Sequence, residues 1–544
     1  MRAECIAWSD VPGLSALFRA FVAQEPEALL QRWYPFSLQP WMGHAPELSS
    51  EHRQRLAAAL EAQAEHFNAS AKAHENIGRL REGAAAVITG QQVSLLGGPL
   101  LTLLKAATAV ARAQQATKQT GRPHVPVFWM ATEDHDLEEV DRVSLLTKSS
   151  VETRSVPMPR PKAPAPVGEL RLPPEISELT AWAEQALSWT PVATLLREAY
   201  VEGSALARAF GRFIAGVFGE HGLVVLDAAA PEFHSLGSRV LRAAIEQAEE
   251  VEQELLSRSR ELIDAGFHAQ VMVLPGHSLL FLLTQKDGQR QRTALLRSTS
   301  EGGRVEWRAG QQRFTQDELL ALAEHEPERL SPNALLRPVF EDAIFPTAAY
   351  VAGPAEIAYF AQSEVVYRRL LGRVTPVLPR LSATLVPASV GKIMASHDIA
   401  VADVWRAKTS DELALRLGAR AMPIEGKRRI ATAGNALDTD LKALTEYMMA
   451  LSADLGRAAS VSANKMRYQM NRLRRMAARF ETEKQASFAR HASAIANAIF
   501  PHGHFAEREL AGAVFLAQAG ELLPQYLVDA SLRACVGHQV IGLG

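Results

Sequence analysis

Short apolar runs alternate along the chain with longer segments of helical periodicity. The first run, residues 84–89, is followed by a glycine-containing turn and an Ala/Leu-rich segment that continues through residue 116. A second apolar run covers residues 125–130. Strand, helix and strand at this separation form the crossover unit of a parallel sheet. The pattern therefore predicts an α/β fold with a doubly wound parallel sheet.

Three later apolar runs, at residues 223–227, 349–352 and 375–378, are short and end in polar or small residues. We expect them to extend the same sheet. The segment before the first strand, residues 50–83, lacks proline and is rich in Ala, Glu, Gln and Leu, which predicts a helix. The sheet and its helices together predict a Rossmann-like core over residues 1–390.

Two segments interrupt the α/β pattern. The Pro-rich stretch 156–174 predicts an irregular connection. Two β-rich runs between residues 270 and 298 flank Lys286-Asp287-Gly288, which is typical of a hairpin turn. We therefore expect insertions in the core at about residues 150–215 and 235–330.

Residues 390–499 differ in kind, because the periodicity is helical throughout. Two seams have apolar residues four and three apart: Leu437, Leu441, Leu444, Met448, Leu451 and Leu455, then Met466, Met470, Leu473, Ala477 and Phe480. A small-residue patch at 456–462 separates them, which predicts an antiparallel helical hairpin or coiled-coil arm within a domain at 391–505. Such a stripe is typical of a core or dimer seam rather than a cofactor site. We expect a homodimer, with residues 506–544 returning to the core.

Composition narrows the class of protein. A chain of 544 residues with 47% apolar content exceeds one minimal core. Its 58 Lys and Arg residues balance 60 Asp and Glu residues, so no general field favours nucleic acid or an anionic membrane. No apolar stretch approaches the roughly 20 residues that span a bilayer. Cys5 and Cys535 form no CxxC pair, and a reducing cytoplasm is the simplest compartment.

The first candidate site follows the first strand. Gly90, Gln91 and Gln92 end the strand, and Gly97, Gly98 and Pro99 open the next helix, which contains Lys105. Glycines here allow backbone N–H groups to approach a ligand, and a helix N-terminus favours an anion. The alternatives are an ordinary tight turn and a solvated lysine.

The second candidate follows the strand at 125–130. Glu133, Asp134, His135 and Asp136 would lie at the carboxyl end of a parallel strand, where open α/β sheets bind ligands. A carboxylate beside an imidazole raises its basicity, which suits proton abstraction from an attacking amine, and the same set could hold a divalent ion. The alternative is an acid-rich helix N-terminus without chemistry.

The third candidate lies at another strand-to-helix junction. Gly353, Glu356 and Tyr359 follow the run at 349–352, and Arg337 precedes it. Arg337 could clamp a carboxylate or phosphate through two hydrogen bonds. Its alternative is an ordinary ion pair with Glu341, four residues on.

Other charged groups give weaker evidence for a functional site. The basic run at 465–479 lacks the interleaved aromatic residues of a single-strand nucleic-acid groove and is typical of a solvated face. His502-Gly503-His504 has no zinc-like partner set, so we assign no metal ligand from the sequence.

These motifs, in this order, resemble the BshC family, the proposed cysteine ligases of bacillithiol synthesis, over almost the whole chain. The matching segments are 88–92 with Gly98-Pro99 and Lys105; 127–129 with 132–136; Arg337-Pro338; 351–354 with Glu356, Ile357 and Tyr359; and Pro376-Val377 with Pro379-Arg380. The resemblance implies a Rossmann-like core with connecting insertions, a coiled-coil domain that promotes dimer formation, and a last step that joins cysteine to glucosaminyl malate.

The sequence departs from related proteins in three places. The family's core resembles class I aminoacyl-tRNA synthetases and nucleotidyl transferases, but no HIGH-like or KMSKS-like signature occurs here. Ala506 stands beside Glu507-Arg508 where the family resemblance leads us to expect Gln. The two isolated cysteines offer no counterpart to the zinc of a related mycothiol-pathway ligase.

Two functional hypotheses follow. In the first, cysteine is activated, with ATP or ADP as the suspected nucleotide, and is joined to the amine of glucosaminyl malate to form an amide. The cluster 133–136 would supply the base, while the first candidate site would contact the nucleotide or sugar and Arg337 and Glu356 would fix the carboxylate and ammonium of the substrate. The rival is a non-catalytic nucleotide-binding or scaffold protein that acts through its coiled-coil arm.

Overall fold

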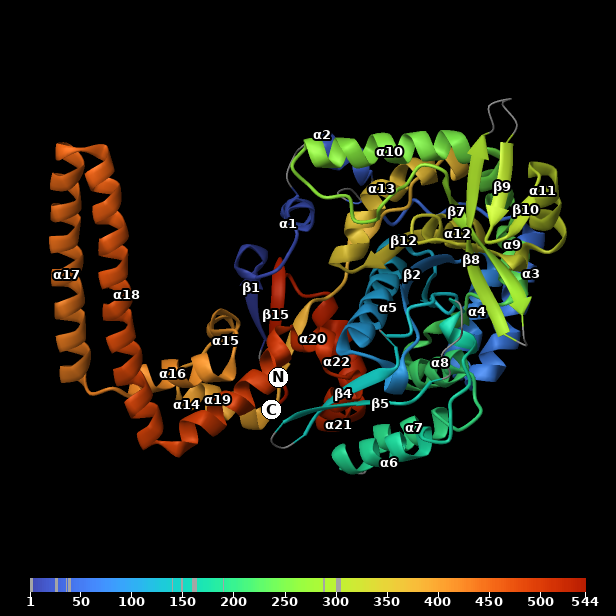
Figure 1. Cartoon of the computed structure of the whole chain (residues 1–544). Helices are drawn as coiled ribbons and strands as arrows, with labels where there is room; N and C mark the ends of the chain where they lie inside the picture. The colour runs from blue at the N-terminus through green and yellow to red at the C-terminus, as the bar shows by residue number, and fades with distance from the viewer. Residues whose placement is uncertain are drawn as a thin grey trace.

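A rounded core carries a long helical arm, and the two chain termini lie side by side between them (Figure 1). Figure 1 draws the computed structural model of the chain. It describes residues 3–24, 28–35, 37, 41–138, 140–147, 150–158, 164–188, 190–286, 289–299 and 305–544.

The central sheet has five parallel strands, which confirms the predicted α/β fold. Their order is β13 (Val377–Pro379), β12 (Thr347–Ala352), β2 (Ala85–Gln91), β3 (His124–Met130) and β6 (Val224–Asp227). The chain passes from β2 to β3 on one side and later adds β12 on the other side of β2. The strand order therefore reverses between β2 and β12, and such a switch point is where open α/β sheets form a ligand crevice.

Helices cover both faces of this sheet, so its strands are buried and apolar throughout. Val127 packs in the cluster formed with α3, α4, α9 and α13, whereas its neighbour Phe128 packs with α5 and α8. The helices are α3 (Ser50–Phe67), α4 (Ala71–Glu82), α9 (Pro231–Glu246), α13 (Pro354–Leu371), α5 (Leu100–Thr120) and α8 (Leu206–Val217). The single helix expected at 50–83 is two helices, because Asn68 adopts a left-handed conformation with φ of 59° and ends α3.

The predicted hairpin belongs to a second, antiparallel sheet inserted in the core. Its strands are ordered β10 (Gln312–Phe314), β9 (Val305–Ala309), β8 (Gln289–Thr299), β7 (His277–Lys286) and β11 (Leu330–Pro332). Asp287 and Gly288 of the expected turn lie outside the described residues. Around this sheet and the rest of the core lie α1 (Ala16–Ala23), α2 (Ala28–Trp33), α10 (Ala248–Asp264), α11 (Gln316–His325) and α12 (Arg337–Ile344). The earlier insertion contains β4 (Arg142–Leu146), β5 (Val151–Ser155), α6 (Ile176–Ala186) and α7 (Pro191–Ala199).

The chain termini share a third sheet. β1 (Ala3–Ala7) and β14 (Ala383–Val386) flank β15 (Gly537–Gly542), and Cys5 and Cys535 form a disulfide. The two cysteines treated as isolated in the sequence are therefore paired, because β1 and β15 bring together segments 530 residues apart. The C-terminal helices α20 (Ala506–Glu509), α21 (Gly512–Ala519) and α22 (Leu523–Ser531) pack on α5.

The arm is an antiparallel hairpin of α17 (Ile424–Leu451) and α18 (Ala453–Lys484), as predicted (Figure 1). Its base contains α14 (Ala388–Ser396), α15 (Val401–Ala407), α16 (Ser410–Ala421) and α19 (Ala486–Ile499). The prediction that the chain turns at 456–462 is wrong. The break between the two helices falls at Ser452, whose backbone is extended. The small residues there serve close helix packing: a Cβ on Gly456 would lie 2.5 Å from the Met449 sulfur.

None of the helices in the described part of the chain combines the length and apolar character that crossing a membrane requires.

Candidate functional site

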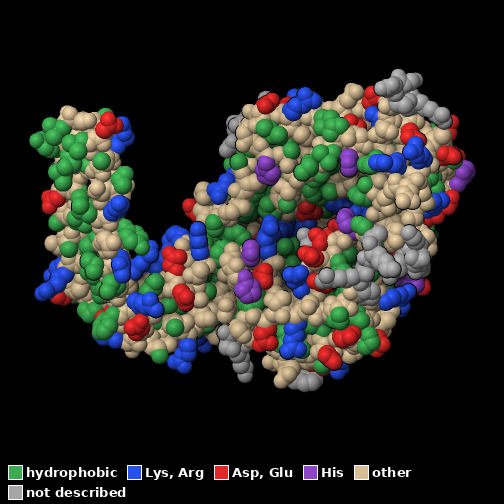
Figure 2. Space-filling model, viewed as in Figure 1, with side chains coloured by type: hydrophobic (Ala, Val, Ile, Leu, Met, Phe, Trp, Pro, Cys, Tyr) green, Lys and Arg blue, Asp and Glu red, His purple; other side chains and the backbone are tan. Residues whose placement is uncertain are grey.

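A polar cavity of about 830 Å³ opens at the carboxyl ends of β2, β3 and β12. Figure 2 shows Lys, Arg, Asp, Glu and His side chains gathered around a hollow in the core. We call this the main cavity. The predicted site residues that line it are Gly90, Gln91, Gln92, Gly98, Pro99, Lys105, Asp134, Asp136, Arg337, Gly353, Glu356 and Tyr359. The switch point therefore gathers residues from all three candidate sites.

A smaller cavity of about 390 Å³ adjoins the main cavity. The two share Ala131, Asp134, Ala334 and Arg337 in their walls. Glu133 and His135 line only the smaller cavity. Much of its wall is apolar, with Trp129, Val271, Leu280 and Phe281 among the lining residues. The candidate site thus has a charged part and a less polar part.

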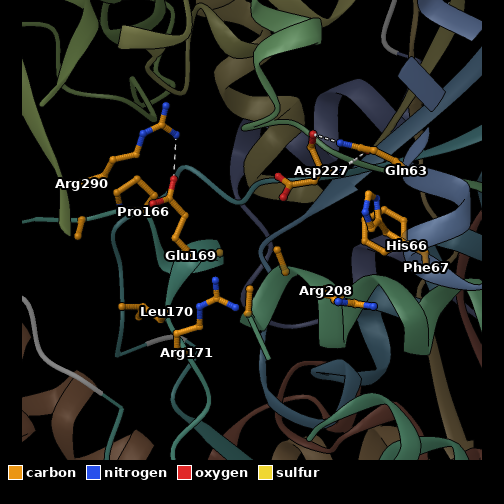
Figure 3. Close-up of a pocket in the computed structure, with 14 residues that line it drawn as sticks. Gln63, His66, Phe67, Pro166, Glu169, Leu170, Arg171, Arg208, Asp227 and Arg290 are labelled. Carbon is orange, nitrogen blue, oxygen red and sulfur yellow. Dashed lines mark hydrogen bonds and ion pairs between the residues drawn. The ribbon is translucent and has the colours of Figure 1, made fainter. Parts of the chain in front are cut away.

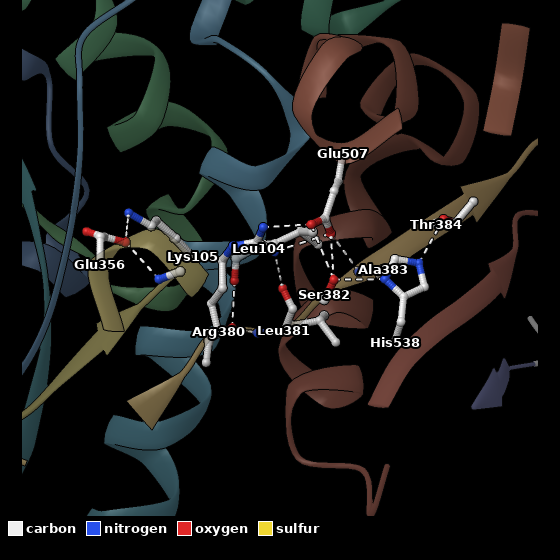
Figure 4. A network of polar contacts seen from close by, with 12 residues as sticks. Leu104, Lys105, Glu356, Arg380, Leu381, Ser382, Ala383, Thr384, Glu507 and His538 are labelled. Atoms are coloured by element: carbon white, nitrogen blue, oxygen red, sulfur yellow. Dashed lines mark hydrogen bonds and ion pairs between the residues drawn. The ribbon is translucent and has the colours of Figure 1, made fainter. Parts of the chain in front are cut away.

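Lys105 of α5 and Glu356 of α13 form a buried ion pair near the carboxyl ends of β2 and β12 (Figure 4). Only 5% of the Lys105 side chain is exposed, and its Nζ donates to the Gly90 carbonyl (2.6 Å) and to Gln91 Oε1 (3.0 Å). Burial lowers the pKa of Lys105, and the neighbouring Glu356 opposes that shift. The alternative interpretation, in which Lys105 is a solvated side chain, is therefore wrong.

Glu356 also fixes the start of α13. Its carboxylate accepts hydrogen bonds from the Gly353 N–H (2.7 Å) and the Tyr350 hydroxyl (2.9 Å). Burial alone would raise the pKa of Glu356, but the charge and hydrogen bond of Lys105 lower it. The carboxylate thus stays available as a fixed negative charge at the cavity wall.

Two glycines of the first candidate site are required for packing. A Cβ on Gly90 would lie 2.9 Å from the Trp129 carbonyl oxygen, so a larger residue would push β2 and β3 apart. Gly97 lines neither cavity, because its N–H is bonded to the Tyr200 hydroxyl at 2.8 Å behind the wall. Its positive φ of 82° explains the glycine there.

The start of α5, expected to attract an anion, is covered by the returning C-terminal segment. The Leu100 N–H donates to the Leu510 carbonyl at 2.8 Å, and the Gly512 N–H donates to the Gly98 carbonyl at 3.0 Å. A ligand in the main cavity therefore cannot bind the Leu100 N–H, and cationic side chains must supply most of any anion binding.

Arg337 lies in both cavity walls and also beside Glu341. Its Nη2 donates to the Tyr359 hydroxyl at 2.6 Å, whereas its Nη1 is 3.6 Å from Glu341 Oε2. Burial raises the pKa of Glu341 well above its ordinary value, although Arg337 opposes this. The guanidinium is thus held mainly by Tyr359 and faces the candidate site.

Arg380 and Glu507 form a second buried pair (Figure 4). Glu507 also accepts from the Ser382 hydroxyl (3.2 Å) and the Ala383 N–H (2.8 Å). Burial alone would raise the pKa of Glu507, but the charge and hydrogen bonds of Arg380 lower it. His538 contacts the same Ser382 at 2.8 Å, and burial lowers its pKa to about 4.

The sequence analysis did not place Arg142, Arg380 and Arg508 in the site, yet all three line the main cavity. Arg380 follows β13 directly, so its position at a strand's carboxyl end was a usable signal. Arg142 and Arg508 come from an inserted hairpin and from the C-terminal segment. No local pattern places these segments at the sheet edge.

The acidic cluster after β3 divides between two environments. Asp134 accepts from Gln92 Nε2 at 2.5 Å and from the backbone N–H of His135 at 2.7 Å, and Asp136 faces the main cavity. His135 Nδ1 lies 3.1 Å from an Arg292 guanidinium nitrogen. Glu139, next to this cluster, lies outside the described residues.

Glu133 is directed into the protein. It forms an ion pair with His234 Nε2 at 2.9 Å and accepts from the Ser331 hydroxyl at 2.7 Å. Burial alone would raise the pKa of Glu133, but the charge of His234 and the hydrogen bonds lower it. Its carboxylate therefore anchors α9 and β11 behind the smaller cavity.

A third cavity, of about 640 Å³, lies against α3, α8 and the end of β6 (Figure 3). Asp227 in its wall accepts a 2.5 Å hydrogen bond from the Thr132 hydroxyl, and Arg290 pairs with Glu169 at 2.8 Å. None of the predicted site residues lines it. Among the described residues, no group of three or more His, Cys, Asp or Glu side chains is arranged to hold a metal ion.

Comparison with known proteins identifies the family. Residues 1–381 match "Bacillithiol biosynthesis BshC, N-terminal Rossmann-like domain", and residues 383–543 match "Bacillithiol biosynthesis BshC, C-terminal coiled-coil domain". A Koribacter versatilis protein named "Putative cysteine ligase BshC" is 40% identical over 99% of both chains. A protein of the same name from Solibacter usitatus is 35% identical over 99% of this chain and 100% of its own. Another, from Salinibacter ruber, is 31% identical over 90% of this chain and 89% of its own. On its sequence, its Rossmann-like core and its helical arm, the chain belongs to the BshC family.

Proposed function

We propose that this protein is a ligase that joins the carboxyl group of cysteine to the amine of glucosaminyl malate, forming the amide of bacillithiol. The names of its relatives support this reaction class. The observation that carries the proposal is the meeting of opposite charges in the main cavity. The carboxylates of Asp134 and Asp136 line the same cavity as the guanidinium groups of Arg142, Arg337 and Arg508, so an amine and a carboxylate substrate both find partners of opposite charge.

In this mechanism the cationic groups bind the carboxylate of cysteine and hold it against the amine. The nitrogen attacks the carboxyl carbon, a C–N bond forms, the activating group leaves and the nitrogen loses a proton. Asp136 is the carboxylate placed to accept that proton, because both oxygens of Asp134 already accept hydrogen bonds from Gln92 and the His135 backbone. Glu133 does not receive it in this scheme, because His234 and Ser331 already occupy its oxygens.

The suspected nucleotide is ATP, which when bound would supply the leaving group on the carboxyl carbon. The residues present fit its anionic part, because the cations of Arg142, Arg337 and Arg508 line the main cavity, whereas Lys105 and Arg380 are already paired with Glu356 and Glu507. We assign no metal ligand. We propose that the enzyme acts in the cytoplasm, as its biosynthetic family suggests, and as a homodimer held by its arm. The Cys5–Cys535 disulfide removes the earlier argument for this compartment from unpaired cysteines.

The test is product formation by the purified protein. His135→Ala should lower turnover about 10²-fold or more while the thermal unfolding curve is unchanged, because His135 lies at an open cavity wall rather than in the core. His325→Ala, which changes an exposed histidine on α11, is the matched control. Undiminished turnover after His135→Ala would contradict a role for this residue. Absence of any product from the native enzyme would favour the scaffold hypothesis.

A further inference from the structure

One ring nitrogen of His135 has a partner that can only donate. Arg292 of β8 places Nη1 3.1 Å from His135 Nδ1. A guanidinium carries N–H donors and no acceptor. Nδ1 must therefore accept this hydrogen bond, and the ring hydrogen must be on Nε2.

The competing arrangement would have Nδ1 donate to Asp134. The Asp134 Oδ1 atom is 3.6 Å from Nδ1, which is too long for a hydrogen bond, and it already accepts the His135 backbone N–H at 2.7 Å. The other Asp134 oxygen accepts from Gln92. The contact with Arg292 is thus the one that decides the tautomer.

Arg292 is itself held in one orientation. Its Nε donates to the Ser331 hydroxyl oxygen at 3.1 Å, and its Nη2 donates to the Pro332 carbonyl at 2.9 Å. Its guanidinium carbon also lies 3.8 Å from the centre of the Phe281 ring, and only 8% of the residue is exposed. A planar guanidinium fixed at three points cannot turn away from His135 without losing buried hydrogen bonds.

The directions of these hydrogen bonds agree along the whole chain of contacts. Glu133, whose pKa is lowered by His234 against the effect of burial, can only accept as a carboxylate, so the Ser331 hydroxyl donates to it at 2.7 Å. The Ser331 oxygen is then free to accept from Arg292, and Arg292 donates to His135. Each hydrogen position follows from the one before it.

We infer that Arg292 is a positioning residue that holds His135 as a neutral imidazole with its hydrogen on Nε2, so that His135 donates to the carbonyl oxygen of the transferred acyl group and is not the general base. This inference rests on the proposed ligase reaction. Nδ1 is directed toward Arg292, and the exposed edge of the ring faces the smaller cavity. A fixed neutral donor at this position would stabilise the negative charge that develops on oxygen during attack.

This arrangement gives the inserted antiparallel sheet a role in positioning His135. Arg292 lies on β8 and Ser331 on β11, and both come from the antiparallel sheet rather than from the Rossmann-like core. The charged groups that contact or approach His135 are Asp134 from its own segment and Arg292, while Glu133, His277 and Arg337 lie in the same cavity wall. The insertion thus sets the hydrogen position of a residue that the core presents.

The direct test is histidine nitrogen NMR on the full-length, ¹⁵N-histidine-labelled protein, with the His135 signals assigned by their loss in His135→Gln. The native protein should show Nε2 protonated and Nδ1 unprotonated at neutral pH. Arg292→Met should allow the other tautomer to appear. Arg290→Met, two residues away on the same strand but paired with Glu169, is the control and should leave the signals unchanged. A hydrogen on Nδ1 in the native protein would overturn the inference.

Kinetics give the second test. Arg292→Met should lower kcat about 10- to 100-fold with little change in KM, and Arg292→Lys should recover part of this loss. His135→Gln, whose amide can donate near the Nε2 position, should retain more activity than His135→Asn. Equal loss in both variants would indicate a base and overturn the donor role. A native protein with the Nε2–H tautomer but no ligase product would instead count against the proposed reaction alone.

Discussion

Arg380, at the end of β13, and Glu507, in the C-terminal segment, share two hydrogen bonds of 2.6 and 3.2 Å across 127 residues of sequence. Both side chains are almost fully buried. Arg380 lines the main cavity, so the C-terminal segment fixes part of the cavity wall. Residues that follow the helical arm therefore complete a site formed by residues that precede it.

Glu507→Gln should test this link. The substitution leaves a buried guanidinium without its charged partner, and such losses destabilise proteins by about 3–5 kcal/mol. Urea unfolding measures the change. Glu521→Gln, an exposed glutamate in the same segment, is the control and should fall within about 0.5 kcal/mol of the native protein. A Glu507→Gln protein of native stability would mean that Arg380 finds another partner.

His538 should make stability depend on pH. Burial lowers its pKa from 6.5 to about 4, so between these values the unfolded chain binds a proton that the folded chain does not. The contribution is fully present above pH 6.5 and is lost as pH falls toward 4. A shift of this size corresponds to about 3 kcal/mol.

The measurement for His538 is the free energy of unfolding at several pH values for the native protein and for His538→Asn. Carboxylates titrate in both proteins, so the difference between the two curves isolates the histidine. The native curve should fall more steeply between pH 6.5 and 4. Parallel curves would show that the pKa of His538 is the same in the folded and the unfolded chain.

Substitutions at the Lys105–Glu356 pair should distinguish its contribution to stability from its contribution to activity. Lys105→Met or Glu356→Gln alone leaves one buried charge and should destabilise the protein by about 3–5 kcal/mol. The double variant removes both charges, so its loss should be smaller than the sum. Ligase activity should be lost in all three. Recovered activity in the double variant would show that the pair only supports the fold.

The arm should hold a homodimer. Twelve of the nineteen large exposed apolar side chains among the described residues lie between Ile424 and Phe480, and Figure 2 shows apolar side chains along the arm. Monomers rarely expose so large a patch. Leu444→Glu with Leu451→Glu, at sites 48% and 60% exposed, should shift sedimentation toward the monomer. Lys442→Glu on the same helix is the control, and an unchanged dimer in the leucine variant would place the interface elsewhere.

Much of the fold could be predicted from local pattern. The strands at 84–89 and 125–130 are buried on both faces, so their apolar runs are unbroken and easy to recognise. Helical periodicity predicted the arm, because apolar residues recur four and three apart along one face of each of its helices. The position of its turn was not predictable, because the small residues at 456–462 suit close packing between helices as well as a break.

By itself, the sequence determined which residues end the parallel strands, and this placed Gln91, Asp134 and Glu356 at one sheet edge. Only the tertiary structure decided their partners. The hydrogen position on His135 depends on Arg292, 157 residues away, the wall around Arg380 depends on Glu507, and Cys5 pairs with Cys535. Periodicity reports the environment of one element, whereas these contacts join insertions and chain ends whose approach is set by packing of the whole chain.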